Sequence, residues 1–201
     1  MYTLLKPLKV REELLRRGVK VFTPHLFAHI FGLNPVTTKH FLENQTIQGF
    51  LLRLKRGVYT LKSDPPSEEE VANTLYQPSY ISFEYALAYY GILPEMSYVV
   101  TSATTKATRL FTTDTTSFSY RTIKPEAYTG YSLIKKDNRS FSIAEFEKAL
   151  VDYLYFVSLR KQDLNDRLIS QAKQQIDKTK LKHYAALFQN QQLDTFIENV
   201  L

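Results

Sequence analysis

Apolar and charged positions at the start of the chain follow a helical spacing. An apolar stripe broken by charges predicts a helix over 4–17, which can kink at Pro7 and which Gly18 ends. The stripe consists of Leu4, Leu8, Leu14 and Leu15. After it, Val19, Val21 and Phe22 predict a short extended segment.

Two short helices are predicted next. Thr23 and Asn34 each precede a proline, and this order is the signal of a helix cap followed by a first turn. We therefore expect helices over 24–31 and 35–44, joined by a tight turn that starts at Gly32. This is the spacing of a helix-turn-helix.

A β-hairpin is predicted to follow these helices. Two β-prone runs, 50–54 and 58–61, are separated by Lys55, Arg56 and Gly57. The glycine suits a tight turn, and the two cations would lie at the tip of the hairpin. Together these elements predict a winged helix-turn-helix domain over 1–62.

A second domain is predicted over 67–201. The stretch 63–66 contains two prolines and has the composition of a stiff linker. Behind it, Ser67 and Glu70 predict a capping box for a helix that reaches residue 76.

The rest of the second domain alternates between β-prone and helical segments. A helix is predicted over 83–90, a hairpin turn at Asp137 and Asn138, and helical segments from 144 onward. The β-prone segments are 80–82, 98–102, 108–112, 117–123, 131–135 and 141–143. The predicted fold class is therefore α+β: a winged helix-turn-helix followed by a mixed α/β domain that ends in several helices.

Positive charge gathers at one end of the chain. The formal net charge is +6, and residues 1–63 carry 11 lysines and arginines against 3 aspartates and glutamates, a net charge of +8. The remaining residues carry 15 against 17, a net charge of −2. A local basic field attracts a polyanion, so the first domain is predicted to bind double-stranded DNA.

The predicted DNA contacts lie on the second helix of the helix-turn-helix and on the hairpin. The N-terminal residues of such a helix enter the major groove, whereas Val36, Phe41 and Leu42 are expected to face the core. The residues expected to contact DNA are Asn34, Thr37, Thr38, Lys39, His40, Arg53, Lys55 and Arg56. The alternative is that they form the solvated surface of a small protein-binding winged helix.

The composition of the chain also indicates the cellular compartment in which it works. The absence of cysteine excludes disulfides, thiolate zinc sites and thiol nucleophiles, and it fits a reducing compartment. Charged residues such as Lys6, Lys9 and Arg11 interrupt any signal-peptide core, and no run approaches the roughly 20 apolar residues that span a bilayer. We therefore expect a cytoplasmic protein with no membrane partner.

No metal, cofactor or catalytic site is predicted. His25 and His29 are four residues apart, but without cysteine or an intervening glutamate they are expected to be a partly buried pair beside Phe27 and Phe31. His183 is expected at the surface. The carboxylates Glu145, Glu147 and Asp152 would suit a nuclease or general acid, but apolar residues dominate their helix, so we expect them on its solvated edge.

Four sequence segments together resemble a known family. They are LKRGVYTL at 54–61, PSYISFEYALAYYG at 78–91, VVTSATTKATRLF at 99–111 and EKALVDYLYF at 147–156. In this order they resemble the AbiEi family, the antitoxins of type IV toxin–antitoxin systems. The resemblance covers nearly the whole chain, and the segment 78–91 is its most specific part.

The resemblance implies a bifunctional antitoxin. Its winged helix would repress its own operon by binding an operator, expected to be an inverted repeat, and its C-terminal domain would oppose a cognate AbiEii-type nucleotidyltransferase toxin. DNA contacts would then fall on six of the residues above: Thr37, Thr38, Lys39, Arg53, Lys55 and Arg56. One departure is that Gln45 and Thr46 replace the apolar spacing usual at the end of the recognition helix.

Other functions stay open at this point. The chain has no Gly-Ser followed by paired carboxylates, so it is not expected to be the nucleotidyltransferase itself. A ligand-responsive transcriptional regulator is the main alternative, because an aromatic-lined pocket would give the same tyrosine-rich sequence. An enzyme fused to a DNA-binding module is a third. The tyrosines of the second domain suit an interface and a sheet core equally.

Overall fold

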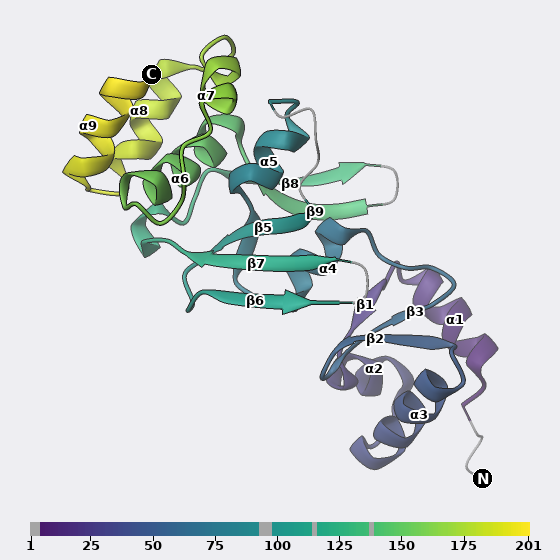
Figure 1. Ribbon diagram of the computed structural model, residues 1–201. Helices are drawn as coiled ribbons and strands as arrows, with labels where there is room; N and C mark the ends of the chain where they lie inside the picture. The colour runs from purple at the N-terminus through teal and green to yellow at the C-terminus, as the bar shows by residue number, and fades with distance from the viewer. Residues whose placement is uncertain (1–4, 93–97, 114–115, 137–138) are drawn as a thin grey trace. The chain divides into compact units, whose positions relative to one another are not determined.

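The computed structural model describes residues 5–92, 98–113, 116–136 and 139–201, and it has the predicted α+β class (Figure 1). The chain forms two compact units, Met1–Leu75 and Tyr76–Leu201. No helix in the described ranges is both long and apolar enough to cross a bilayer.

The first unit combines helices with a small antiparallel sheet. Its helices are α1 (Pro7–Arg16), α2 (Pro24–Phe31), α3 (Pro35–Ile47) and α4 (Glu68–Leu75). Its strands are β1 (Val21–Phe22), β2 (Leu51–Lys55) and β3 (Val58–Leu61), paired in the order β1-β3-β2. Helix α1 begins at Pro7 and not at residue 4, because Lys6 keeps an extended backbone and proline suits the first helical position. Leu4 lies outside the described residues.

The predicted caps define the start of α2 and of α3. Thr23 Oγ1 accepts a hydrogen bond from Leu26 N at 3.2 Å, and Asn34 Oδ1 accepts one from Thr37 N at 2.9 Å. Gly32 ends α2 in the left-handed conformation, with φ at 62°. These contacts confirm both helix starts.

Helix α3 runs to Ile47, past the predicted end at residue 44. Its last turn is held by Thr46 Oγ1, which donates to Leu42 O at 2.7 Å. Gln45 is buried and donates through Nε2 to Gln48 Oε1 at 3.0 Å. Both polar side chains therefore find hydrogen-bond partners at the end of the helix.

Phe27 is the centre of the core of the first unit. Its ring is fully buried and lies 5.4 Å from Phe22, 4.6 Å from Phe31 and 5.4 Å from Phe41, measured between ring centroids. The other fully packed members of this core are Val10, Leu14, Phe22, Leu42, Leu51, Tyr59 and Leu61. Every helix from α1 to α3 and each strand of the sheet contributes to it.

Helix α4 belongs to the first unit, so the division of the chain comes after Leu75 and not at the proline-containing linker. The predicted capping box is present: Ser67 N donates to Glu70 Oε2 at 2.9 Å, and Glu70 N donates to Ser67 Oγ at 3.3 Å. Glu70 also forms an ion pair with Lys20, at 3.4 Å between Oε2 and Nζ. This pair joins α4 to the residue before β1.

The second unit is built on a six-stranded mixed sheet. Its strands are β4 (Ser79–Ile81), β5 (Val99–Thr104), β6 (Arg109–Thr112), β7 (Ser117–Thr122), β8 (Tyr131–Lys136) and β9 (Arg139–Ala144), in the order β6-β7-β5-β4-β9-β8. The pairs β5–β7 and β4–β9 are parallel, and the others are antiparallel. The hairpin turn predicted at Asp137 and Asn138 lies outside the described residues.

Helices cover the sheet of the second unit and form its C-terminal end (Figure 1). They are α5 (Phe83–Tyr89), the 3-10 helix η1 (Pro125–Ala127), α6 (Phe146–Ser158), α7 (Asp166–Ala172), α8 (Lys178–Ala186) and α9 (Gln191–Val200). The long α6 contacts α5 on one side and α8 and α9 on the other. The predicted series of helical segments after residue 144 is confirmed.

The ring of Phe27 sets the stability of the first unit. Phe27→Ala is expected to lower the free energy of unfolding of this unit by about 3–5 kcal/mol, because it leaves a cavity among three aromatic rings. Hydrogen exchange of the α2 and α3 amides measures this unit separately. Leu26→Ala, at the exposed neighbouring position, is the control. Equal protection in the two variants would contradict the central role of Phe27.

Candidate nucleic-acid interface and a buried ion pair

The N-terminal half of α3 carries a row of exposed polar side chains. Asn34, Thr37, Lys39 and His40 are exposed, as a DNA-contacting face requires. Asn34 has a second role, because its side chain caps the helix through Thr37 N. The helix start is therefore held rigidly while its polar groups stay accessible.

The predicted orientation of two residues on α3 is wrong. Thr38 was expected to contact DNA, but it is only 1% exposed, whereas Val36 was expected in the core and is 67% exposed. Thr38, Leu42 and Gln45 are spaced for one helix face, and this is the face that packs inward. Val36 lies on the opposite face. Helical phase therefore outweighs the polarity of the individual side chain.

The exposed face of α3 also contains residues that are not among the predicted DNA contacts. Besides Val36, they are Glu43, Asn44 and Ile47. Helical periodicity could have identified these exposed residues. The positions four before and three after the buried Leu42 share its inward face, so positions out of phase with it point outward. The exposed row of α3 is thus longer and less basic than predicted.

The hairpin β2–β3 presents fewer cations than predicted. Arg53 and Arg56 are exposed, but Lys55 is half-buried and its Nζ donates to Leu75 O at the end of α4. The register of the β2–β3 pairing shifts between Arg53 and Lys55, so the regular alternation of side chains along β2 is interrupted there. Lys55 therefore caps the C-terminus of α4, where a cation is favoured.

The charge of the first unit is less positive than that of residues 1–63. Residues 1–75 carry 11 lysines and arginines against 7 aspartates and glutamates, a net charge of +4. The additional acids are Asp64 and the first turn of α4, Glu68, Glu69 and Glu70. The three glutamates stabilise the N-terminus of α4 through their interaction with the helix dipole.

Histidines do not form a metal site in the described part of the chain. His25 and His29 are both exposed, so the prediction of a partly buried pair is wrong. The residues of α2 that face the core are Phe27 and, in part, Ile30. His183 is exposed, as predicted. No cluster of three or more His, Asp or Glu residues suited to a metal ion occurs within the described ranges.

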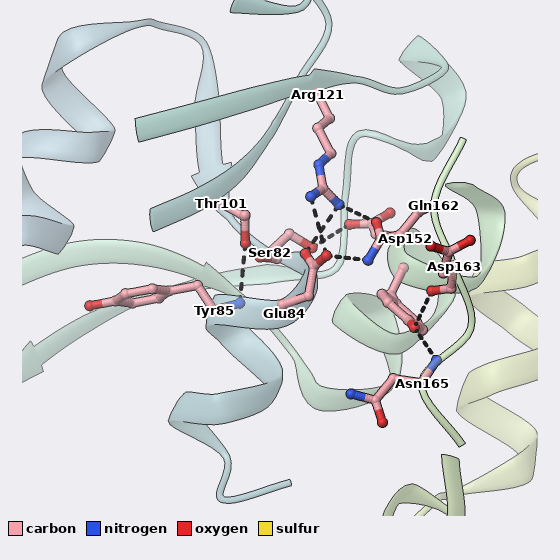
Figure 2. A network of polar contacts seen from close by, with 10 residues as sticks. Ser82, Glu84, Tyr85, Thr101, Arg121, Asp152, Gln162, Asp163 and Asn165 are labelled. Carbon is pink, nitrogen blue, oxygen red and sulfur yellow. Dashed lines mark hydrogen bonds and ion pairs between the residues drawn. The ribbon is translucent and has the colours of Figure 1, made fainter. Parts of the chain in front are cut away.

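A buried ion pair lies on α6 in the second unit. Asp152 and Lys148 both have fully buried side chains, and Lys148 Nζ donates to Asp152 Oδ1. The other oxygen, Asp152 Oδ2, accepts hydrogen bonds from Ser82 Oγ at 2.6 Å and from Tyr80 Oη at 3.0 Å (Figure 2 shows Ser82 and Asp152). Asp152 was expected on a solvated helix edge, and this prediction is wrong.

The other two carboxylates of this region differ from Asp152. Glu147 is also buried, against prediction, and accepts a hydrogen bond from Asp177 N at 3.2 Å. Glu145 precedes α6 and keeps a partly exposed side chain, which pairs with Lys180 at 3.3 Å. The three carboxylates therefore do not converge on one open site.

Burial shifts the pKa values of the ion pair in opposite directions. It lowers the pKa of Lys148, although the neighbouring Asp152 acts against this shift. It raises the pKa of Asp152, although Lys148, Ser82 and Tyr80 favour the charged carboxylate. The pKa of Tyr80 is raised well above its usual value, first by burial and then by the charge of Asp152. Hydrogen bonds thus make a buried charge tolerable.

A second polar network joins α5, β7 and the segment after α6 (Figure 2). Arg121 contacts Glu84 at 3.1 Å between Nη1 and Oε2 and donates from Nη1 to Gln162 Oε1 at 2.6 Å. Gln162 Nε2 in turn donates to Glu84 Oε1. The guanidinium also lies 4.8 Å from the ring centroid of Phe83. This network holds three elements together.

The tyrosines of the second unit divide between core and surface. Tyr80, Tyr85, Tyr120 and Tyr153 are buried, whereas Tyr89, Tyr98 and Tyr131 are exposed. One exposed ring, Tyr131, stacks on the buried Tyr80 at 4.5 Å between centroids. The core role is therefore present, whereas the interface role stays a prediction.

Removing one partner of the buried pair is expected to destabilise the second unit. Lys148→Met should lower its free energy of unfolding by about 3–5 kcal/mol, because Asp152 stays buried without a cation. Without Lys148, nothing offsets the effect of burial, so the pKa of Asp152 in the folded state rises further above its value in the unfolded chain. The loss of stability should therefore grow as the pH rises and Asp152 ionises. Denaturant unfolding, monitored by hydrogen exchange of the α6 amides at several pH values, measures both the loss of stability and its dependence on pH.

Two further variants complete this test. Lys180→Met breaks only the exposed pair with Glu145 and should leave the unfolding midpoint unchanged. The double variant Lys148→Met with Asp152→Leu removes both charges and should recover part of the lost stability, because the buried Ser82 and Tyr80 hydroxyls lose their shared acceptor. If the single and double variants unfolded alike, the buried charge would not be the cause.

Comparisons with other proteins do not identify the chain. No protein-family model matches it, and a search of curated proteins finds no match. The family resemblance therefore stays a prediction, and functional inference rests on the residues and geometry described above.

Proposed function

We propose that this chain is a DNA-binding repressor that acts through its first unit. The main support is the exposed N-terminal half of α3, which Asn34 caps and α2 braces from behind. The elements follow one another as α1-β1-α2-α3-β2-β3, with the sheet order β1-β3-β2. A helix pair followed by a hairpin is the arrangement in which winged helix-turn-helix proteins present their recognition helix.

The exposed side chains have the chemistry that DNA recognition needs. Asn34 and Thr37 carry groups that hydrogen-bond to base edges or phosphates, and Lys39 suits a phosphate. Arg53 and Arg56 on the hairpin supply further cations for the DNA backbone. Since Lys55 is engaged at the end of α4 and Thr38 is buried, we assign them no direct DNA contact.

We further propose that the protein is an antitoxin that represses its own operon. This part is supported by the resemblance of the four sequence segments to the AbiEi family. The operator would be an inverted repeat, and the second unit would oppose a cognate AbiEii-type nucleotidyltransferase toxin. Exposed Tyr89, Tyr98 and Tyr131 give the second unit side chains that suit a protein interface.

A ligand-responsive regulator is the second candidate, because the second unit contains a groove. It has a volume of about 690 Å³ and lies between the end of α6 and α9. Its lining includes Val157, Arg160, Gln192, Thr195 and Phe196. A ligand there would have to combine apolar surface with hydrogen-bonding groups.

The DNA-binding proposal is tested by gel shift on the DNA upstream of the chain's own coding sequence. The full-length protein is expected to retard this DNA at physiological salt in the presence of scrambled competitor. Lys39→Ala with Arg56→Ala should weaken binding, and each phosphate that is no longer neutralised should reduce the slope of log affinity against log salt by about 0.9. Lys178→Ala, an exposed cation of the second unit, is the control. An unchanged slope in the double variant would remove α3 and the hairpin from the contact surface.

The antitoxin proposal is tested in cells that express an adjacent nucleotidyltransferase reading frame. The chain should restore growth, and the Lys39→Ala, Arg56→Ala variant should restore it equally while it loses repression of a reporter. This separation is expected because both substitutions lie in the first unit. Growth arrest that persists with the wild-type chain would contradict the antitoxin proposal and leave the repressor proposal standing.

A further inference from the structure

Helix α3 turns an aliphatic side chain outward at its N-terminal end. Val36 is 67% exposed and shares the exposed helix face with His40 and Glu43. Its spacing from these residues, four and seven positions, keeps all three on one line along the helix. Thr38 and Leu42 occupy the inward side. Val36 therefore contributes little to the core of the first unit.

The position of Val36 restricts what it can contact on DNA. In a recognition helix, the N-terminal residues approach the base edges in the major groove. Valine has only methyl groups to offer, so it cannot take part in hydrogen-bonded base recognition. The apolar group that base edges present in the major groove is the C5-methyl group of thymine.

We propose that Val36 selects thymine by packing its methyl groups against the thymine C5-methyl. This inference rests on the proposed function, since it requires α3 to enter the major groove. It goes further by naming a base and the side chain that reads it. The polar neighbours Asn34 and Thr37 would then contact adjacent groups, and Val36 would add the apolar part of the recognition.

The same helix offers a matched control for this proposal. Ile47 is 84% exposed and lies at the other end of α3. It lies eleven positions after Val36, which corresponds to about 16 Å along the helix axis. Truncating Ile47 removes a similar exposed aliphatic group but leaves the base beside Val36 untouched.

The test compares two versions of the DNA upstream of the coding sequence. One contains thymine, and the other contains uracil in its place, which keeps every hydrogen-bonding group and removes only the C5-methyl. Affinities of the full-length protein for both duplexes are measured by fluorescence anisotropy at one salt concentration. Wild type should bind the uracil duplex about fourfold more weakly for each thymine methyl group that Val36 packs against.

The variants assign this preference to Val36. Val36→Ala should lose most of the preference for thymine, because only its Cβ methyl remains; Val36→Ile should keep the preference, and Ile47→Ala should keep the wild-type ratio. All three substitutions are at exposed positions, so their thermal unfolding should match that of wild type.

The outcomes separate this inference from the proposed function. A wild type that binds neither duplex overturns the proposed DNA binding. Equal wild-type affinity for both duplexes leaves DNA binding standing and overturns methyl recognition. If Val36→Ala kept the wild-type ratio, or Ile47→Ala lost it, the methyl group would be read elsewhere and the assignment to Val36 would be wrong.

Discussion

The ion pair between Lys148 and Asp152 is the constraint around which the second unit is arranged. Neither side chain touches water, so the carboxylate needs every hydrogen bond that Ser82 and Tyr80 provide. These four residues come from α6, from β4 and from the start of α5. The hydrogen bonds to the buried carboxylate thereby fix the position of α6 against β4.

The buried ion pair connects two of the four segments on which the predicted resemblance rests. Its most specific segment, 78–91, supplies Tyr80 and Ser82, and the segment 147–156 supplies Lys148 and Asp152. Side chains of the two segments meet in the core of the second unit. These four side chains are buried, so they hold the second unit together and form no part of its surface.

Local signals in the sequence predicted local structure well. Thr23, Asn34 and the Ser67–Glu70 capping box each act within a few residues, and each is confirmed by a hydrogen bond. Errors arose where a side chain's surroundings come from distant residues. Asp152 looked like a solvated carboxylate because its partners Tyr80 and Ser82 lie about seventy positions earlier in the chain. Thr38 and Val36 differ from the prediction because helical phase, and not side-chain polarity, decides which residues of α3 face the core.

Lys55 connects strand β2 to the C-terminus of α4, two elements that lie on either side of the predicted domain boundary. It ends strand β2, yet its ammonium group holds the carbonyl of Leu75, the last residue of the unit. The end of the hairpin strand and the point where the chain leaves the unit are thus tied together by one hydrogen bond. The strand end and the C-terminus of α4 therefore hold each other in place within the first unit.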